Sequence, residues 1–550
     1  MAPRSRVEPL LRALDPEQRA AAELPDGPAQ VIAPAGSGKT TTLIARLGVL
    51  LERGVAPGQI AVVTFNRDAA AELSARIATR LAPLVPGAEA IEVRTLHALA
   101  RQVLIDAGEP VRMLADRLPL MRAARRRASA RRDPEGAPVP EAALLDAQLS
   151  AWKVEGRQVP EESVGAIAAF EALLATRGLI DFDDLVVGAV ARLERDDRLR
   201  ASWQTRFTHL CVDEFQDVDA AQLRLVRLLA APHDNLFVVG DDDQTIYAWR
   251  LADVRRILGF RDLYPASRRI QLATNYRCPS SVITASRRLI EVNEQRFAKR
   301  IESPQGRREA SEATGLLDGS TPDWPERVAD LAARESVLRG RSCILARTRA
   351  ELVPVMQALI RAGIRHATSL TTPLESAVVQ ALLEAAQQLP ADVEPFHALR
   401  RIRAVRRWQR GDQSDALGDE DHAALDAVLG WAAGFRRLDR FLVAAQAAAA
   451  RTATLRDSSA PLELVTVHGA KGREWPTVIV VGWEEERFPN RRALVDAVDP
   501  ERALEEERRL AYVALTRAAE RLVLVFDPAR PSRFLEEMGY RPTSGATTVR

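Results

Sequence analysis

The ten residues VIAPAGSGKT, at positions 31–40, decide the fold of this chain. They join an apolar run, typical of a short buried strand, to a segment that reads as a helix. A strand, a glycine-containing loop and a helix N-terminus in this order form the phosphate cradle of P-loop proteins, although a glycine-rich turn without a ligand gives a similar pattern. Ala33 stands where the usual pattern has its first glycine, but Gly38-Lys39-Thr40 is intact. The stretch therefore predicts an α/β core that binds a nucleotide.

Each residue of such a cradle has an expected task. Lys39 would neutralise the β- and γ-phosphates of ATP, and the Thr40 hydroxyl would be a ligand of Mg²⁺. ATP and Mg²⁺ are therefore the expected cofactors. The loop residues expected to contact ATP are Ala35, Gly36, Ser37 and Gly38.

The composition is that of several globular domains. The chain has 550 residues, of which 47% are hydrophobic and 28% are charged. No apolar run is long enough to span a bilayer and no signal peptide is recognisable, so we expect no membrane association. The three cysteines, Cys211, Cys278 and Cys343, lie far apart and predict neither a disulfide framework nor a zinc site, which favours the cytoplasm.

Lysine is rare in this chain. Lysine and arginine together number 77 and the formal net charge is only +2, so the overall charge does not indicate a nucleic-acid partner. An ammonium group is a compact charge that a guanidinium replaces poorly in a tight phosphate loop, so the lysines that remain are informative. They are Lys39, Lys153, Lys299 and Lys471.

Acidic and amide residues follow two further predicted strands. Residues 208–217, THLCVDEFQD, place Asp213 and Glu214 at a strand end, as in the second half of a P-loop ATPase. Asp213 would hold Mg²⁺ and Glu214 would polarise the attacking water, although paired acids at a strand end can also be merely solvated. After the strand that ends at Gly240, Gln244 could sense a γ-phosphate through an uncharged hydrogen bond.

Two aromatic residues, Tyr247 and Trp249, follow in a polar context. Aromatic residues make up only 5% of the chain, which weakens the alternative that these two are ordinary core residues. Stacking of a nucleobase on such a ring contributes about 1–3 kcal/mol. The pair therefore predicts a nucleic-acid contact.

Nine short motifs in a fixed order resemble those of superfamily 1A DNA helicases of the UvrD/PcrA/Rep type. They cover most of the chain, and their order makes a chance match negligible. The motifs are LDPEQ at 14–18, the P-loop at 33–40, TF at 64–65, TLH at 95–97, DEFQD at 213–217, GDDDQTIYAWR at 240–250, NYR at 275–277, VHGAKG at 467–472 and YVALTR at 512–517.

The resemblance implies two RecA-like P-loop cores, each a parallel sheet flanked by helices, with helical insertions and with ATP between the cores. It implies that Gln18 and Tyr276 hold the adenine and that Glu474 reaches the ribose. Arg277 and Arg517 would touch the γ-phosphate. The residues it implies for DNA binding are Phe65, His97, Tyr247 and Trp249.

The resemblance also implies a division into six parts. The strand that begins at 343–346 is expected to be the first full strand of the second core. The segment 366–460 is short for the accessory 2B domain of this family, and about 25 residues after the last strand leave no room for a further folded domain. The parts are 1–97 (core 1A, first part), 98–184 (helical insertion 1B), 185–275 (core 1A, second part), 276–365 (core 2A, first part), 366–460 (reduced 2B-like insertion) and 461–550 (core 2A, second part, and a short tail).

The implied function is an ATP-dependent helicase or translocase that moves 3′ to 5′ on single-stranded DNA, in DNA repair, replication restart or recombination. Its expected partners are single-stranded DNA and junctions of single- and double-stranded DNA, with a repair or defence protein as a possible further partner. One alternative is a translocase or motor subunit that unwinds little alone. Another is an ATP-gated DNA-binding module, which the combination of Glu214, Gln244, Arg277 and Arg517 disfavours.

Two arginine-rich segments, 122–132 and 400–410, have no assigned role. On a helix, Arg400, Arg403, Arg407 and Arg410 would share one face, because residues three and four apart are neighbours. Leu399, Ile402 and Val405 would form another stripe that packs against the body. Such a face is either simply solvated or contacts duplex phosphates.

Overall fold

The computed structural model describes residues 5–131, 137–304, 313–408, 417 and 419–540. The chain forms two compact units. Unit 1 comprises Met1–Thr274 and Gln295–Arg300, and unit 2 comprises Asn275–Glu294 and Ile301–Arg550. Within the described ranges, no helix has the length and apolar character needed to cross a bilayer.

Unit 1 contains a six-stranded sheet in which every neighbouring pair is parallel. The strand order is β3-β2-β4-β5-β1-β6. The P-loop strand β1 thus lies between β5 and β6, so the loops after β1 and β5 leave the same edge of the sheet. The strands are β1 (Ala29–Ile32), β2 (Ile60–Thr64), β3 (Glu92–Thr95), β4 (His209–Val212), β5 (Leu236–Gly240) and β6 (Arg268–Gln271).

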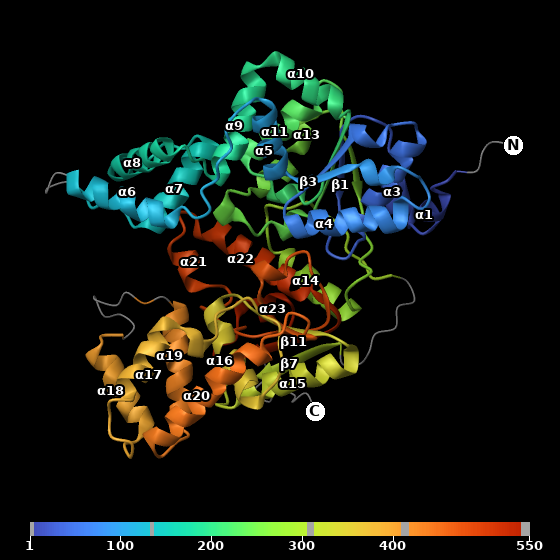
Figure 1. Cartoon of the computed structure of the whole chain (residues 1–550). Coiled ribbons are helices and arrows are strands. Elements are labelled where there is room, and N and C mark those ends of the chain that lie inside the picture. The colour runs from blue at the N-terminus through green and yellow to red at the C-terminus, as the bar shows by residue number, and fades with distance from the viewer. Residues whose placement is uncertain (1–4, 132–136, 305–312, 409–416, 418, 541–550) are drawn as a thin grey trace. The chain divides into compact units, whose positions relative to one another are not determined.

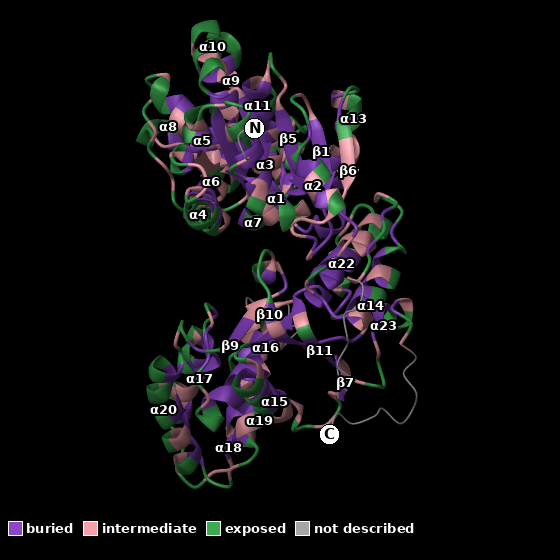
Figure 2. Cartoon of the chain, turned by 90° about the vertical axis from the view of Figure 1, so that its right-hand side faces the viewer, coloured by how far each residue is buried: buried purple, intermediate pink, exposed green. Residues whose placement is uncertain are grey.

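Both faces of the four central strands of this sheet are buried, whereas the edge strands β3 and β6 are partly exposed (Figures 1 and 2). Successive side chains of a strand point to opposite faces, so Val31 and Val239 join one hydrophobic cluster while Ile32 and Val238 join the other. Helices cover each face, as is typical of parallel sheets. One cluster draws on α1 (Glu8–Arg12), α2 (Pro16–Ala22), α3 (Lys39–Glu52) and α4 (Arg67–Arg76), and the other on α5 (Leu96–Asp106), α9 (Phe182–Arg195), α10 (Asp197–Arg206), α11 (Ala220–Ala230), α12 (Val254–Leu258) and α13 (Phe260–Leu263).

Three helices between α5 and α9 have a separate hydrophobic cluster. They are α6 (Leu118–Arg131), α7 (Ala142–Glu155) and α8 (Glu161–Arg177). Leu145 and Phe170 are fully buried in it. The first arginine-rich segment lies on α6, where Arg122, Arg126 and Arg127 are exposed.

Unit 2 contains a five-stranded parallel sheet in the order β7-β11-β10-β8-β9. The expectation that 343–346 begins the first strand of this core is wrong, because β7 precedes it. β7 is an edge strand of which only Leu317 is buried, so its apolar pattern is weak. The strands are β7 (Thr314–Asp318), β8 (Ser342–Ala346), β9 (Leu462–Thr466), β10 (Trp475–Val480) and β11 (Ala518–Phe526).

The helices that the structure describes within residues 366–460 pack directly on the sheet of unit 2. Leu382, Val428 and Phe441 share one hydrophobic cluster with Ile344 and Ile479. The two parallel, helix-flanked sheets confirm the predicted α/β fold class, whereas the six-part division stays a prediction. The helices of unit 2 are α14 (Ser280–Ile290), α15 (Trp324–Arg339), α16 (Arg349–Ala362), α17 (Ala377–Ala386), α18 (Pro395–Val405), α19 (Asp419–Ala432), α20 (Leu438–Leu455), α21 (Arg491–Val495), α22 (Pro500–Leu515) and α23 (Arg533–Glu537).

The predicted arginine face on residues 400–410 is wrong in its geometry. Helix α18 ends at Val405, and Arg407 has a positive φ of 55°, so it leaves the helical path. Arg403 turns inward, where its Nη1 lies 2.5 Å from Asp426 Oδ1 on α19. Leu399 is buried as expected, but Val405 is 76% exposed. Arg410 lies outside the described residues.

Candidate functional site

The loop between β1 and α3 has the geometry of a phosphate cradle. Gly36 and Gly38 have positive φ angles of 71° and 78°, which glycine adopts without steric cost. Ala33 causes no conflict, because it is buried and its N–H extends the β1–β5 pairing by donating to Gly240 O at 2.9 Å. Helix α3 begins at Lys39, so its first N–H groups point toward the loop.

One observation shows that this loop fits a phosphate group. The Ser37 hydroxyl is buried and has no hydrogen-bond partner among the described residues, so it is an unused donor inside the loop. The positive φ of Gly38 favours glycine there, and a Cβ at this position would also displace the Gln18 amide, whose Nε2 would lie 2.5 Å away. The Ser37 N–H, by contrast, donates to Pro34 O at 3.1 Å within the loop itself.

Gln18 supports the loop from helix α2. Its Nε2 donates to Ser37 O at 2.9 Å, and its Oε1 accepts a hydrogen bond from Asp15 N at 3.1 Å. The buried amide therefore ties the start of α2 to the P-loop. The contact of Gln18 with adenine stays a prediction.

Glu214 lies beside the P-loop lysine. Lys39 Nζ is 3.6 Å from Glu214 Oε2, and Gln216 Nε2 donates to the same oxygen at 2.5 Å. Glu214 has a positive φ of 53°, and its N–H donates to Asp213 Oδ1 at 2.9 Å. The end of β4 thus carries two neighbouring carboxylates, and Glu214 lies beside the P-loop lysine. The roles of Asp213 in holding Mg²⁺ and of Glu214 in orienting water stay predictions.

Gln244 lies in a short 3₁₀ turn after β5, and Asp241 fixes its side chain. Its Nε2 donates to Asp241 Oδ2 at 2.7 Å, and both residues are buried. Asp241 N–H donates to Gln216 Oε1 at 3.0 Å. Gln216 therefore bridges the two strand ends, a role that sequence reasoning did not identify although the residue lies inside the quoted DEFQD motif.

The aromatic residues predicted to bind DNA form a contiguous group in unit 1. The rings of Phe65 and Tyr247 stack with their centroids 4.6 Å apart at 16°, and Trp249 lies edge-on to Tyr247 at 6.3 Å. Trp249 is 63% exposed, and the Arg250 guanidinium lies 4.5 Å from its ring centroid. This exposure excludes the alternative that Trp249 is an ordinary core residue.

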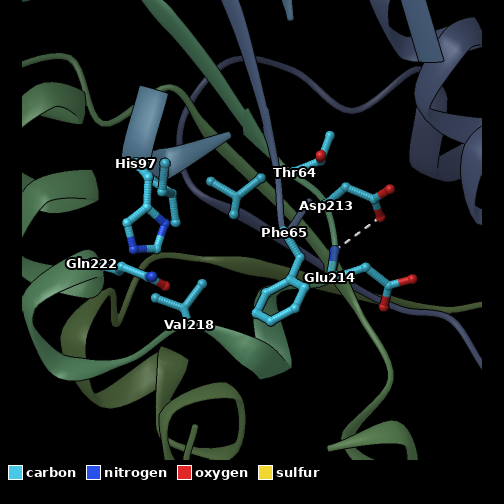
Figure 3. A pocket seen from close by; sticks show the side chains of 9 residues that line it. Thr64, Phe65, His97, Asp213, Glu214, Val218 and Gln222 are labelled. Carbon is cyan, nitrogen blue, oxygen red and sulfur yellow. Dashed lines mark hydrogen bonds between the residues drawn. The ribbon is translucent and has the colours of Figure 1, made fainter. Parts of the chain in front are cut away.

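A small cavity of about 10 Å³, roughly the size of one water molecule, is lined both by the carboxylates at the end of β4 and by residues predicted to bind DNA (Figure 3). Its lining includes Asp213, Glu214, Phe65 and His97, and in Figure 3 the Phe65 ring is drawn between His97 and Glu214. Burial lowers the pKa of His97, so its imidazole is neutral near pH 7. The structure thus places the predicted water-orienting residue and two predicted DNA-binding residues around one space.

The remaining predicted site residues belong to unit 2 and lie close to one another. Arg277 Nε donates to Glu474 Oε2 at 2.5 Å, and its Nη1 donates to Thr516 O at 3.2 Å. Arg517 is 1% exposed and donates from Nε to Val513 O at 3.0 Å. Tyr276 is exposed. The pair Arg277–Glu474 brings together two residues that the sequence places almost two hundred positions apart.

The chain matches two helicase domain models. Residues 14–265 match the UvrD/REP helicase N-terminal domain, and residues 424–527 match the UvrD-like helicase C-terminal domain. The ATP-dependent DNA helicase UvrD2 of Mycobacterium tuberculosis is 30% identical over 614 residues, covering 98% of this chain and 83% of the relative. The chain belongs to the UvrD/REP helicase family.

Other relatives agree with this family. PcrA of Bacillus subtilis is 27% identical, covering 94% of this chain and 83% of that protein. DNA helicase II of Salmonella typhimurium is 28% identical, covering 97% of this chain and 88% of that protein. UvrD/REP membership confirms the resemblance and the prediction of an ATP-dependent helicase enzyme. The roles of the individual site residues stay predictions.

Proposed function

We propose that this protein is an ATP-dependent DNA helicase that moves 3′ to 5′ along single-stranded DNA, in repair, replication restart or recombination. The observation that carries the proposal is a cavity whose lining includes both Glu214 and the aromatic residue Phe65. A movement of the Phe65 ring on DNA binding would change the space beside the Glu214 carboxylate. Junctions of single- and double-stranded DNA are the expected substrates, and a cytoplasmic location stays a prediction.

The residues of unit 1 divide the work of hydrolysis. Lys39 neutralises phosphate charge, Glu214 orients the attacking water, and Gln216 holds the Glu214 carboxylate in place. Thr40 and Asp213 offer the hydroxyl and carboxylate oxygens that Mg²⁺ prefers. When bound, Mg²⁺ would supply positive charge to the phosphates.

We infer that Arg277 and Arg517 of unit 2 stabilise the charge that develops on the transferred phosphate. Arg277 Nη1 donates to Thr516 O, and Arg517 Nη2 donates to Thr516 Oγ1. Both guanidinium groups are therefore held at the same residue of unit 2. Arginine side chains are suited to this task, because they stay charged and donate several hydrogen bonds in a fixed geometry.

A motor subunit with weak unwinding of its own is the second candidate. The match to the M. tuberculosis relative extends over 614 residues, whereas this chain has 550, so the relative has segments that this chain lacks. In unit 2, the described helices of 366–460 share one hydrophobic cluster with the sheet. A repair or defence protein would then supply the missing contacts.

One experiment on the purified chain distinguishes the two candidates. ATP hydrolysis is expected to rise at least about tenfold on adding single-stranded DNA. A duplex with a 3′ tail is expected to be unwound in preference to one with a 5′ tail, and the yield separates a helicase from a motor subunit. Absence of DNA-stimulated hydrolysis would refute both candidates, and preference for the 5′ tail would refute the direction.

Trp249→Ala is expected to uncouple hydrolysis from movement. The ring is exposed, so its loss should leave the melting temperature nearly unchanged while removing about 1–3 kcal/mol of base stacking. The measurements are ATPase activity and the rate of displacing a protein block from single-stranded DNA. Trp152→Ala, another exposed tryptophan in unit 1, is the matched control. Equal loss of hydrolysis and displacement would contradict the stacking role.

A further inference from the structure

A buried cluster of charges lies immediately after β5. Lys299 Nζ is 2.5 Å from Asp241 Oδ1, 2.6 Å from Asp242 Oδ1 and 2.9 Å from Asp243 Oδ2. Arg296 also contacts Asp243, through two hydrogen bonds of 3.0 and 2.8 Å. The Lys299 side chain is 1% exposed and the three carboxylates are fully buried. Charges removed from water in this way are tolerated only when paired, so each member depends on the others.

This cluster is connected to the residues proposed to act in hydrolysis. Asp241 Oδ2 accepts the hydrogen bond of Gln244, and Asp241 N–H donates to Gln216, which in turn holds Glu214. An unbroken series of contacts therefore runs from Lys299 through Asp241 to both residues. A displacement of Asp241 would therefore move the side chains of Gln244 and Glu214, which face the γ-phosphate in the proposed function.

The charge of Asp241 depends on its cationic neighbours. Burial by itself would raise the pKa of Asp241, but the ammonium groups of Lys299 and then Lys39 outweigh it and lower the pKa below its ordinary value. At Asp242 the effect of burial outweighs that of the Lys299 ammonium group, and the pKa is raised to about 6. Asp241 thus stays ionised and remains a strong acceptor for the Gln244 amide.

Lys299 belongs to a short segment with unusual connectivity. Gln295–Arg300 is part of unit 1, while the residues before and after it in the chain belong to unit 2. Within unit 1 the segment is held by the Lys299 and Arg296 contacts and by Phe297 N, which donates to Asp242 Oδ2 at 2.8 Å. The cluster is therefore also the anchor of this segment.

We propose that Lys299 is a positioning residue for ATP hydrolysis. By fixing Asp241, it orients the side chains of Gln244 and Glu214. The inference rests on the proposed function of unit 1. Lys299 acts through Asp241 rather than on the nucleotide, so its loss should impair turnover more than ATP binding. A purely structural lysine would instead lower stability without a selective effect on turnover.

Lys299→Met tests this inference, because methionine keeps an unbranched side chain, one atom shorter than that of lysine, and removes its charge. The kcat of DNA-stimulated ATP hydrolysis is expected to fall at least about tenfold, since small misplacements of catalytic groups are costly. The KM for ATP and the binding of a fluorescent ATP analogue are expected to change less than about threefold, because the P-loop is untouched. Parental kcat in a folded Lys299→Met protein would overturn the inference.

Lys153→Met is the matched control. Lys153 is also buried in unit 1 and also lies against three carboxylates, with Nζ 2.8 Å from Glu171, 2.9 Å from Asp181 and 2.7 Å from Asp184. These partners belong to α8 and to the start of α9, not to the P-loop or its strand ends. This variant is expected to lose thermal stability to a similar degree while its kcat stays within about twofold of the parent. An equal fall in kcat in both variants would mean that Lys299 acts through stability alone.

A double variant keeps the test decisive if Lys299→Met folds poorly. Adding Asp242→Asn removes one negative charge from the cluster and leaves Asp241 intact. The double variant is expected to regain melting temperature but not kcat, because Asp241 still lacks its anchor. Recovery of both would overturn the inference, since Lys299 would then merely balance charge. A parent protein without any ATPase activity would refute the proposed function instead, so the two failures are distinguishable.

Discussion

Lys39→Ala is expected to abolish detectable ATP hydrolysis, and Glu214→Gln to slow it at least about a hundredfold while ATP still binds. The two side chains lie 3.6 Å apart but have different tasks. Lys39 contributes charge to the bound phosphates, whereas Glu214 only orients water. The measurements are DNA-stimulated ATPase activity and equilibrium binding of a fluorescent ATP analogue.

Glu155→Gln is the matched control for this prediction. Glu155 is a partly buried carboxylate of unit 1 that pairs with Arg256 at 2.9 Å, away from the P-loop. The same chemical change there should leave turnover near the parental rate. Hydrolysis by Glu214→Gln at the parental rate would show that the assignment of the water-orienting residue is wrong.

Arg277→Ala and Arg517→Ala are each expected to lower DNA-stimulated hydrolysis at least about a hundredfold, since arginines that stabilise a transferred phosphate contribute about 10³–10⁵ in kcat. Neither change should abolish binding of single-stranded DNA, because the predicted DNA-binding rings lie in unit 1. The measurements are ATPase activity and fluorescence anisotropy with a labelled oligonucleotide.

Arg517 needs a control for stability, because it is buried and donates hydrogen bonds to backbone carbonyls of Val513 and Arg473. Arg521→Ala removes another buried arginine of unit 2, whose partner is Glu335. If Arg521→Ala lowers the melting temperature as much as Arg517→Ala does but keeps nearly parental turnover, the loss of turnover in Arg517→Ala is due to a role in hydrolysis and not to lower stability. A variant at Arg277 or Arg517 that loses DNA binding but keeps full turnover would contradict the proposed role.

The arginine-rich segment 400–410 shows where reasoning from periodicity fails. The spacing of Arg400, Arg403 and Arg407 fits one helical face, yet spacing contains no information on where a helix ends. The helix stops at Val405, and Asp426 of another helix draws Arg403 inward. A single tertiary ion pair and one residue with positive φ were enough to remove the predicted face.

The edge strand β7 was missed for a related reason. Interior strands of a parallel sheet are buried on both sides and read as continuous apolar runs, as β2 and β5 do. Thr314–Asp318 lies at the edge of its sheet and is largely half-buried, so its sequence lacks that signal. The order of strands in both sheets was likewise not predictable, because it depends on long-range pairing.

The sequence by itself determined the family, the P-loop and the residues at its strand ends, because each of these is a local pattern of a few residues whose geometry follows from the chain. Only the tertiary structure decided which of these residues touch. Lys299 was noticed as a rare lysine, but its contact with Asp241 joins positions far apart in the chain, and no local pattern encodes such a pairing. The same holds for Gln216, since the atom that it contacts on Asp241 comes from a different strand end.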